Sequence, residues 1–435
     1  MKRYDLERLS ELCLQNDSVD PELYSQYDVK KGLRDINGKG VVAGLTNVSF
    51  IRSSRNGEPC EGRLFYRGKD INELVSQIVE GGTLGYERIA YLLIFGKEPD
   101  AAELAEFNEL LASLRQLPKN FVRDVVMKAP SDDIMLSLSE SVLMLSGYDK
   151  NCLDISLPNV LEQCLRLISL FPQLAVYGYH AYNYYINNDS MYIHYPEPGL
   201  SAAQNLLMLL RPDRCFTALE AAALDIALIL HMEHGGGNNS TFTMRVVTSS
   251  GTDTYSAVAA ALGSLKGPRH GGANVRVTGM MNELKSRLSS PDDEAGVRRF
   301  FEDILDKKAY DRSGLIYGMG HAVYSVSDPR AGILKEFARR LSVEKGRDDD
   351  YRIFSMAERI APEIISERRR IYKGVSANVD FYSGFVYELL NIPPELYTPI
   401  FAVARIVGWS AHRLEELVGG GKIIRPAYIG LCGDE

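Results

Sequence analysis

Residues 265–274 (LKGPRHGGAN) place one histidine, His270, on a turn after an apolar helical stretch over 255–265. The Gly-Pro pair before it cannot continue a regular helix. The two glycines after it have no Cβ, so they allow a ligand or another backbone to come close. This arrangement can present an imidazole to a ligand, although the ten residues alone favour a helix corner with a solvated histidine.

A second stretch, residues 230–242, ends an apolar helical pattern with His231 and His234, followed by three glycines and two asparagines. Two histidines three apart on a helix could hold a metal, but their spacing is not the His-Glu-x-x-His of zinc proteases. The glycines follow a helix and do not open one, so they are a poor phosphate-binding loop. The alternative is that His231 packs in the core and His234 caps the helix.

Two later stretches add a third histidine, an arginine and a carboxylate. His321 follows two glycines, and Arg330 ends an Asp-Pro-Arg turn nine residues later. An arginine in such a turn, taken alone, is more often part of a surface ion pair. Asp380 lies in the apolar stretch 378–384, where burial would raise its pKa towards that of a general base. Taken alone, Asp380 fits a helix cap better than a base.

Together these residue types favour carbon-acid chemistry. A carboxylate can remove a proton next to a carbonyl, while neutral imidazoles donate hydrogen bonds to the developing oxyanions. Arginines can hold a dicarboxylate through paired hydrogen bonds. No serine or cysteine nucleophile motif competes with this interpretation.

The elements that must position these residues are mainly helical. A short β region is expected at 48–51 and 62–66, with a polar loop over 52–61 between its strands. Helical periodicity then predicts a helix over 86–95 with Gly96 as its cap, and another over 101–117 that Asp100 opens. The same periodicity predicts helices over 133–147, 159–171, 200–210, 216–233, 253–265, 331–342 and 399–418. Another helix is expected to open at 290–294 with proline at its first position.

Length and composition agree with a soluble enzyme of about two domains. The chain has 435 residues, 45% of them hydrophobic and 24% charged, and 49 basic against 57 acidic residues give a net charge of −8. This balance argues against a nucleic-acid partner. Six scattered cysteines without a CxxC pair suit a reducing cytoplasm, and the longest apolar stretch carries Glu220 and Asp225, which argues against a membrane span.

The motifs, in their order along the chain, resemble those of the citrate synthase family from about Gly62 to the C-terminus. The matching segments are 62–68 (GRLFYRG), 231–242, 267–274, Gly320-His321 with 328–330, 378–384 (NVDFYSG), 401–412 (FAVARIVGWSAH) and 424–426 (IRP). Each segment alone could arise by chance. Their occurrence together and in family order makes the resemblance specific.

The resemblance implies condensation of acetyl-CoA with oxaloacetate, followed by hydrolysis of citryl-CoA. By this resemblance Asp380 is the base, His270 hydrogen-bonds the enol oxygen and His321 polarises the oxaloacetate carbonyl. The residues expected to bind the oxaloacetate carboxylates are His234, Arg330, Arg405 and Arg425. No metal and no cofactor are expected, since the CoA thioester is a substrate.

The family fold implies a mostly all-α, two-domain homodimer with a small N-terminal β element. The expected large domain covers 1–271, with its β region at about 40–68, and the expected small domain covers 272–388. Residues 389–435 return to the large domain and form a tail, from which Arg425 is expected to reach the partner subunit's active site. Closure of the two domains would then assemble the site and exclude water.

The CoA contacts depart from the family pattern. Many relatives have a basic residue between the Gly-His and Asp-Pro-Arg motifs, but residues 322–327 (AVYSVS) have none. Lys373 matches another basic position of the family and is the candidate for CoA binding. The nearby run 368–370 (RRR) is more typical of a solvated helix face.

Three alternatives to citrate synthase follow from the sequence. The nearest is 2-methylcitrate synthase, which would use propionyl-CoA, because one methylene in an apolar pocket changes binding by only about 1–3 kcal/mol. A metal-dependent hydrolase built on His231 and His234 is the second. A non-catalytic acyl-CoA-binding or scaffold protein is the third, and it would not need the histidines, Asp380 and the arginines together.

Overall fold

The computed structural model describes residues 10–11, 13–15, 18–35, 40–321, 323–324, 326–369 and 374–431. The chain divides into two units, residues 1–45 and residues 46–435. The first unit contains the short helix α2 (Pro21–Gln26) and the 3₁₀ turn η1 (Lys31–Leu33). Asp20 caps α2 by accepting a hydrogen bond from the backbone N–H of Glu22, and Pro21 occupies the first helical position.

The second unit begins with a three-stranded antiparallel sheet in the order β1 (Ser49–Arg55), β2 (Glu58–Tyr66) and β3 (Lys69–Asp70). The polar loop predicted over 52–61 is wrong, because both strands run into it. Asn56 and Gly57, with φ of 54° and 86°, form the two-residue turn between them. An Asn-Gly pair is the strongest short signal for such a hairpin, because both turn residues need positive φ.

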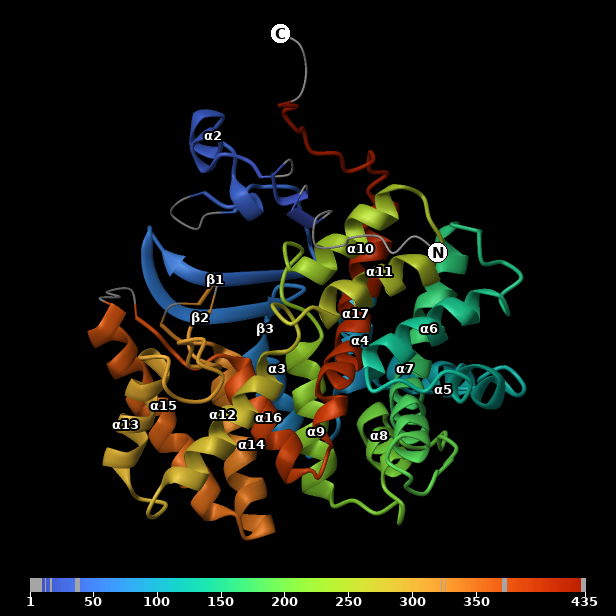
Figure 1. Ribbon diagram of the computed structural model, residues 1–435. Helices are drawn as coiled ribbons and strands as arrows, with labels where there is room; N and C mark the ends of the chain where they lie inside the picture. Colours follow the sequence, from blue (N-terminus) through green and yellow to red (C-terminus); the bar gives the residue numbers. More distant parts are fainter. Residues whose placement is uncertain are drawn as a thin grey trace, which may run out of the picture. The chain divides into compact units, whose positions relative to one another are not determined.

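All the remaining elements of this unit are helical (Figure 1). The first group comprises α3 (Ile71–Glu80), α4 (Tyr86–Phe95), α5 (Ala101–Ser113), the π-helical turn η2 (Val122–Val126), α6 (Ile134–Ser146), α7 (Leu157–Tyr185), α8 (Ala202–Leu210), α9 (Ala218–His231), α10 (Asn239–Ser249) and α11 (Thr254–Lys266). The second group comprises α12 (Ala273–Arg287), α13 (Glu294–Leu305), α14 (Pro329–Lys345), α15 (Asp348–Arg369), α16 (Val379–Leu389), the turn η3 (Pro394–Leu396) and α17 (Tyr397–Val418).

The predicted helix ends are confirmed where the sequence contains a clear capping residue. Helix α4 ends at Gly96 with φ of 79°, and Asp100 opens α5 through a capping box with Glu103. The helix predicted to open at 290–294 is present, but the first position predicted for its proline is wrong, because α13 begins at Glu294 with Asp293 as its cap. Helix α7 continues well past its predicted end, through Pro172, because it is buried along most of its length.

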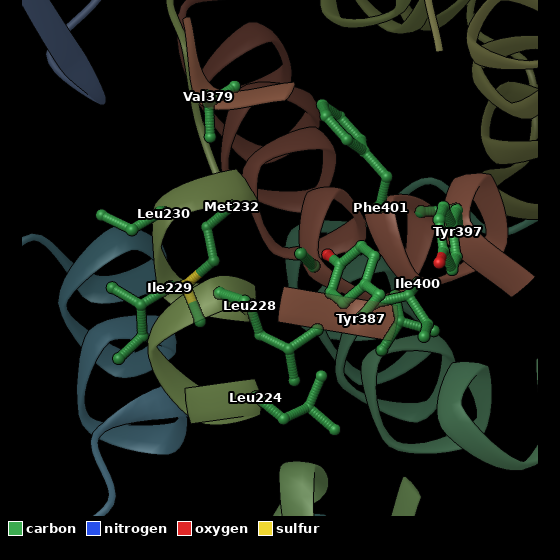
Figure 2. Close-up of a cluster of buried hydrophobic side chains, with 14 of the residues drawn as sticks. Leu224, Leu228, Ile229, Leu230, Met232, Val379, Tyr387, Tyr397, Ile400 and Phe401 are labelled. Atoms are coloured by element: carbon green, nitrogen blue, oxygen red, sulfur yellow. The ribbon is translucent and has the colours of Figure 1, made fainter. Parts of the chain in front are cut away.

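Helix α17 is the central element of the second unit. It packs against α4, α6, α7, α9, α10 and α11, and Figure 1 shows it among them. The close-up in Figure 2 shows where α9, α16 and α17 meet: Leu228 and Met232 from the end of α9, Tyr387 from α16, and Ile400 and Phe401 from α17. This apolar contact places the end of α9 and the middle of α17 side by side.

Helices α12 to α16 pack on one another, and α14 and α16 also contact α9. These helices lie within the range predicted for the small domain, and that domain division stays a prediction. None of the described helices combines the length and the apolar character that crossing a membrane would require.

Candidate active site

The turn after α9 carries the first pair of predicted site residues. His231 is fully buried, and its Nδ1–H donates to the carbonyl of Ala227 at 2.7 Å, so His231 belongs to the core as the alternative interpretation had it. His234 is also buried, but it lies beyond the helix, whose cap residue is Met232. Gly235 follows with φ of 87°, a conformation that favours glycine and turns the chain at this point.

His270 lies on the turn between α11 and α12. Its Nε2 accepts a hydrogen bond from the backbone N–H of Ser240, at the start of α10, at 3.3 Å. The Ser240 hydroxyl oxygen also lies 3.0 Å from Nε2. When Nε2 is the acceptor in these contacts, the proton of the neutral ring is on Nδ1, which can donate it to a ligand. Burial, with a further contribution from Arg405, lowers the pKa of His270 to about 4, so the ring is neutral at physiological pH.

His321 has the opposite tautomer. Its Nδ1 accepts from the backbone N–H groups of Val323 at 3.0 Å and Tyr324 at 3.2 Å, which leaves the ring proton on Nε2. The rings of His321 and His234 are 5.1 Å apart between centroids, and the ring of Tyr324 contacts both. Two histidines from segments far apart in the sequence therefore meet here.

Arg330 is buried in the first turn of α14, and the surface ion pair suggested by its sequence context is wrong. Asp328 caps this helix and holds the Arg330 guanidinium through two bonds, Nε to Oδ1 at 3.0 Å and Nη2 to Oδ2 at 2.8 Å. Burial alone would raise the pKa of Asp328, but the charge of Arg330 outweighs it and keeps that pKa below its usual value. The N–H groups on Nη1 of Arg330 are not used by Asp328.

Asp380 lies in the first turn of α16, and the cap of this helix is Asn378, whose Oδ1 accepts the backbone N–H of Asp380 at 3.0 Å. The side chain amide of Asn378 also donates to the Gly320 carbonyl at 2.8 Å, so the segment of His321 is tied to that of Asp380. Burial raises the pKa of Asp380 to about 6, against an opposing effect of Arg330. A carboxylate with this pKa suits a general base near neutral pH.

Arg405, on α17, is the common neighbour of these groups. Its Nε donates to the His231 carbonyl at 2.8 Å. Burial is the main cause of the lowered pKa values of His234 and His270, and the charge of Arg405 adds to both, whereas it opposes the rise in the pKa of Asp380. Burial lowers the pKa of Arg405 to about 10, so it remains cationic at neutral pH. A buried cation, neutral imidazoles and a basic carboxylate are thus collected in one place.

Three of the groups described above have buried polar atoms that no described residue satisfies: Nε2 of His231, Nε2 of His234 and Nη1 of Arg405. Other atoms of this kind, such as Oγ of Ser137, lie elsewhere in the described chain. A buried unsatisfied polar group costs about 1–3 kcal/mol, and such groups are rare in folded proteins. A polar ligand that accepts hydrogen bonds from Arg405 would remove part of this cost. The arrangement is that of an anion site next to a base.

The structure does not bring every predicted residue to this place. Arg425 is exposed in the tail after α17, and its side chain makes no hydrogen bond or ion pair with the described residues. Lys373 lies outside the described residues. Within the described part of the chain, no three histidine, cysteine, aspartate or glutamate side chains are grouped as a metal site requires, so the hydrolase alternative has no ligand set there.

Sequence reasoning missed several residues that hold the site. Asp328 was seen only as part of a turn, and Tyr324 carried no signal of its own. Glu233 stands between His231 and His234, where its carboxylate accepts hydrogen bonds from Ser49 and His412. A buried glutamate inside a two-histidine motif was the available signal for its role.

Comparison with known proteins accounts for this geometry. Residues 33–427 match the family model described as "Citrate synthase, C-terminal domain". The chain belongs to the citrate synthase family. It is 36% identical to a citrate synthase of Synechocystis sp., over 90% of this chain and 89% of the relative, and 32% identical to a 2-methylcitrate synthase of Shewanella oneidensis, over 93% and 96%.

Solved structures of the family have the same fold. The citrate synthase of Pyrobaculum aerophilum superposes with a TM-score of 0.75 at 29% identity, covering 92% of this chain and 93% of that one. A ternary complex of the Thermoplasma acidophilum enzyme with carboxymethyl coenzyme A and oxaloacetate gives 0.74 at 26% identity, with coverages of 94% and 97%. The predicted mostly all-α citrate synthase fold is confirmed, and membership of the family makes the chain an acyltransferase.

Proposed function

We propose that the chain is a citrate synthase that condenses acetyl-CoA with oxaloacetate and then hydrolyses citryl-CoA to citrate and CoA. In the first step a carbon–carbon bond forms between the acetyl methyl carbon and the ketone carbon of oxaloacetate. In the second step water adds to the thioester and CoA leaves as the thiol. Both steps use only these substrates and water, with no cofactor and no metal.

Asp380 takes the proton from the acetyl methyl group in this proposal. Its raised pKa makes it a stronger base than an exposed carboxylate, and as the anion it is ready to accept a proton at neutral pH. His270 donates its Nδ1–H to the enol oxygen, and His321 donates its Nε2–H to the oxaloacetate ketone. A backbone N–H directed at the other ring nitrogen favours each of these tautomers.

Oxaloacetate is proposed to lie against His234, Arg330 and Arg405. The buried unsatisfied atoms Nε2 of His234 and Nη1 of Arg405 support this assignment, because substrate oxygen atoms would satisfy them. This single observation carries the proposal: buried polar groups are nearly always hydrogen-bonded in folded proteins, and a bound ligand would supply the partners that these two atoms lack. The N–H groups of Arg330 that Asp328 does not use are available to the same carboxylates.

The remaining expectations stay proposals. The enzyme is proposed to work in the cytoplasm, in the tricarboxylic acid cycle, as a homodimer in which Arg425 enters the site of the partner subunit. The exposure of Arg425 and its lack of a described partner are compatible with that role. The small domain, 272–388, is proposed to close over the substrates, with Lys373 near the CoA phosphates.

Propionyl-CoA is the second candidate donor, which would make the chain a 2-methylcitrate synthase. The similarity to the Shewanella enzyme favours keeping this candidate, as does 31% identity to a citrate/2-methylcitrate synthase of Bacillus subtilis. The test is thiol release from either acyl-CoA in the presence of oxaloacetate. We expect a higher kcat/KM with acetyl-CoA, and thiol release from neither donor would overturn the proposed function.

A further inference from the structure

Behind His234, three side chains form a continuous hydrogen-bonded chain that leads away from the substrate site. Glu233 is completely buried next to His234, His412 lies on α17, and Arg245 lies on α10. The Nε2–H of His412 donates to Oε1 of Glu233 at 3.0 Å. Arg245 donates to Nδ1 of His412 from both Nε, at 3.1 Å, and Nη2, at 2.7 Å.

The guanidinium of Arg245 fixes which atoms of these hydrogen bonds donate and which accept. A guanidinium has only donors, so Nδ1 of His412 must be an acceptor and its proton must be on Nε2. At its outer end Arg245 is held by Glu415 and by Glu416, the latter at 2.8 Å from Nη1. Arg245 therefore fixes the tautomer and the orientation of His412, and His412 delivers one donor to Glu233.

Glu233 connects His412 to the turn that carries His234. Its Oε1 also accepts the backbone N–H of Gly235 at 2.6 Å and the hydroxyl of Ser49 at 2.9 Å. Burial opposes ionisation of Glu233, but the hydrogen bonds from His412 and Ser49 and the charge of Arg405 keep its pKa below its usual value. Its anion is thus the partner that holds Gly235 in place directly after His234.

One face of α17 makes hydrogen bonds on both sides of this turn. Arg405 and His412 are seven residues apart on α17 and so lie on one face. Arg405 bonds the carbonyl of His231 before the turn, while His412 bonds Glu233 within it. The closeness of the contact shows at Gly408 between them, where a Cβ would come within 2.3 Å of the Met232 carbonyl oxygen.

We propose that Glu233, His412 and Arg245 are positioning residues that set the affinity of the site for oxaloacetate by holding the turn of His234 beside the Arg405 guanidinium. None of the three is assigned contact with substrate, and each acts through its neighbour. The proposal rests on the proposed function, because it names oxaloacetate as the ligand of His234 and Arg405. It predicts a loss confined to oxaloacetate binding, with acyl-CoA kinetics little changed.

The test compares His412→Leu with His412→Gln, measuring oxaloacetate Kd by calorimetry and KM for both substrates. Leucine removes the donor to Glu233 and the acceptor for Arg245, whereas the glutamine amide can still donate to Glu233. For His412→Leu we expect a rise in oxaloacetate Kd of about tenfold, the size of one lost hydrogen bond to a charged group. For His412→Gln we expect a rise of less than about threefold, and for both variants an acyl-CoA KM within about twofold of wild type.

The matched control is His180→Leu. His180 is likewise buried and bonds a backbone carbonyl, that of Leu209, through Nε2 at 3.1 Å, but it has no bond to the chain of Glu233. This variant should lose stability and keep its oxaloacetate Kd. An equal rise in Kd for His180→Leu would show that general loosening explains the effect, and the proposal would fall.

A milder variant covers the case in which His412→Leu does not fold. Arg245→Met leaves His412 in place but frees its orientation, and we expect at least about a threefold rise in oxaloacetate Kd. Oxaloacetate Kd unchanged in every folded variant, with wild type binding normally, would overturn the inference alone. A wild-type protein that neither binds nor converts oxaloacetate would overturn the proposed function, and the inference with it.

Discussion

At the scale of single residues, the surroundings of a side chain decide its chemistry. Asp380 has an ordinary carboxyl group and is partly buried, and this burial raises its pKa to about 6, while the fully buried Glu233 has a pKa below its usual value. The difference lies in the partners. Glu233 receives three hydrogen bonds on one oxygen, whereas Asp380 is held by a hydrogen bond from its backbone N–H to Asn378.

The pKa of Asp380 predicts the acid limb of the pH profile. A base must be deprotonated, so kcat/KM for the acyl-CoA should rise with pH and level off above about pH 6 to 7. Bound oxaloacetate, a dianion, can only move this limb to higher pH, because a like charge raises a carboxyl pKa. Initial rates from about pH 5 to pH 8 measure it, and a flat profile across that range would exclude Asp380 as the base.

The same residues show how far sequence reasoning reaches. His270, His321 and Asp380 could be identified because each stands beside glycines or in an apolar stretch, and the resemblance supplied their roles. Glu233 and His412 are 179 positions apart, and no local pattern announces that a helix face will join them. The buried ion pair between Arg330 and Asp328 was also missed, because the Asp-Pro-Arg sequence does not show whether such an ion pair lies on the surface or in the interior.

At the scale of elements, close backbone contact between α17 and the end of α9 holds the site together. Gly408 permits this contact, because a Cβ there would lie 2.3 Å from the Met232 carbonyl oxygen and 2.5 Å from a carboxylate oxygen of Glu233. Real Cβ atoms do not approach so closely, so a larger residue must push the two segments apart. Stability and substrate binding depend on the same contact.

Gly408→Ala is therefore expected to lower the free energy of unfolding by about 1–3 kcal/mol, as overpacked cores do. It should also raise KM for oxaloacetate, because the turn of His234 moves with the end of α9. Denaturant unfolding and steady-state kinetics measure the two effects.

The control is Gly263→Ala, in α11, where a Cβ would meet nothing within 4 Å. Alanine should stabilise that helix by roughly 0.5–1 kcal/mol and leave kinetics unchanged. A Gly408→Ala protein as stable as wild type would show that the contact is not as tight as described.

The boundaries of helices could be predicted where local residues determine them, and could not where tertiary packing does. Gly96 and Asp100 mark their helix ends because each satisfies the end groups of a helix locally. Helix α7 passes through Pro172, where local propensity predicts an end, because α6, α8 and α17 pack along it and outweigh that propensity. The Asn56-Gly57 hairpin was predictable, since its signal lies in the two residues themselves.

At the scale of the whole molecule, the proposed dimer makes a prediction about Arg425. If Arg425 acts on the partner subunit's site, Asp380→Ala and Arg425→Ala homodimers should each be nearly inactive. In a mixed dimer one site would then carry both mutations and the other neither. Unfolding, mixing and refolding the two variants should therefore restore activity.

Mass spectrometry of the refolded mixture is the control, because it shows whether mixed dimers form. With Arg425 acting within its own chain, every site of a mixed dimer carries one lesion and the mixture stays inactive. Mixed dimers without recovered activity would contradict the shared site.

The central claim is that a partly buried carboxylate, near neutral imidazoles and arginines, starts the reaction by removing a proton from the acyl-CoA. Turnover of Asp380→Asn tests it most directly, together with oxaloacetate binding by the same protein. Asparagine has nearly the same shape but cannot accept the proton, so kcat should fall by about 10²–10⁴-fold while oxaloacetate Kd stays within a few-fold of wild type. A folded Asp380→Asn enzyme that binds oxaloacetate normally and keeps more than about a tenth of wild-type turnover would contradict the claim.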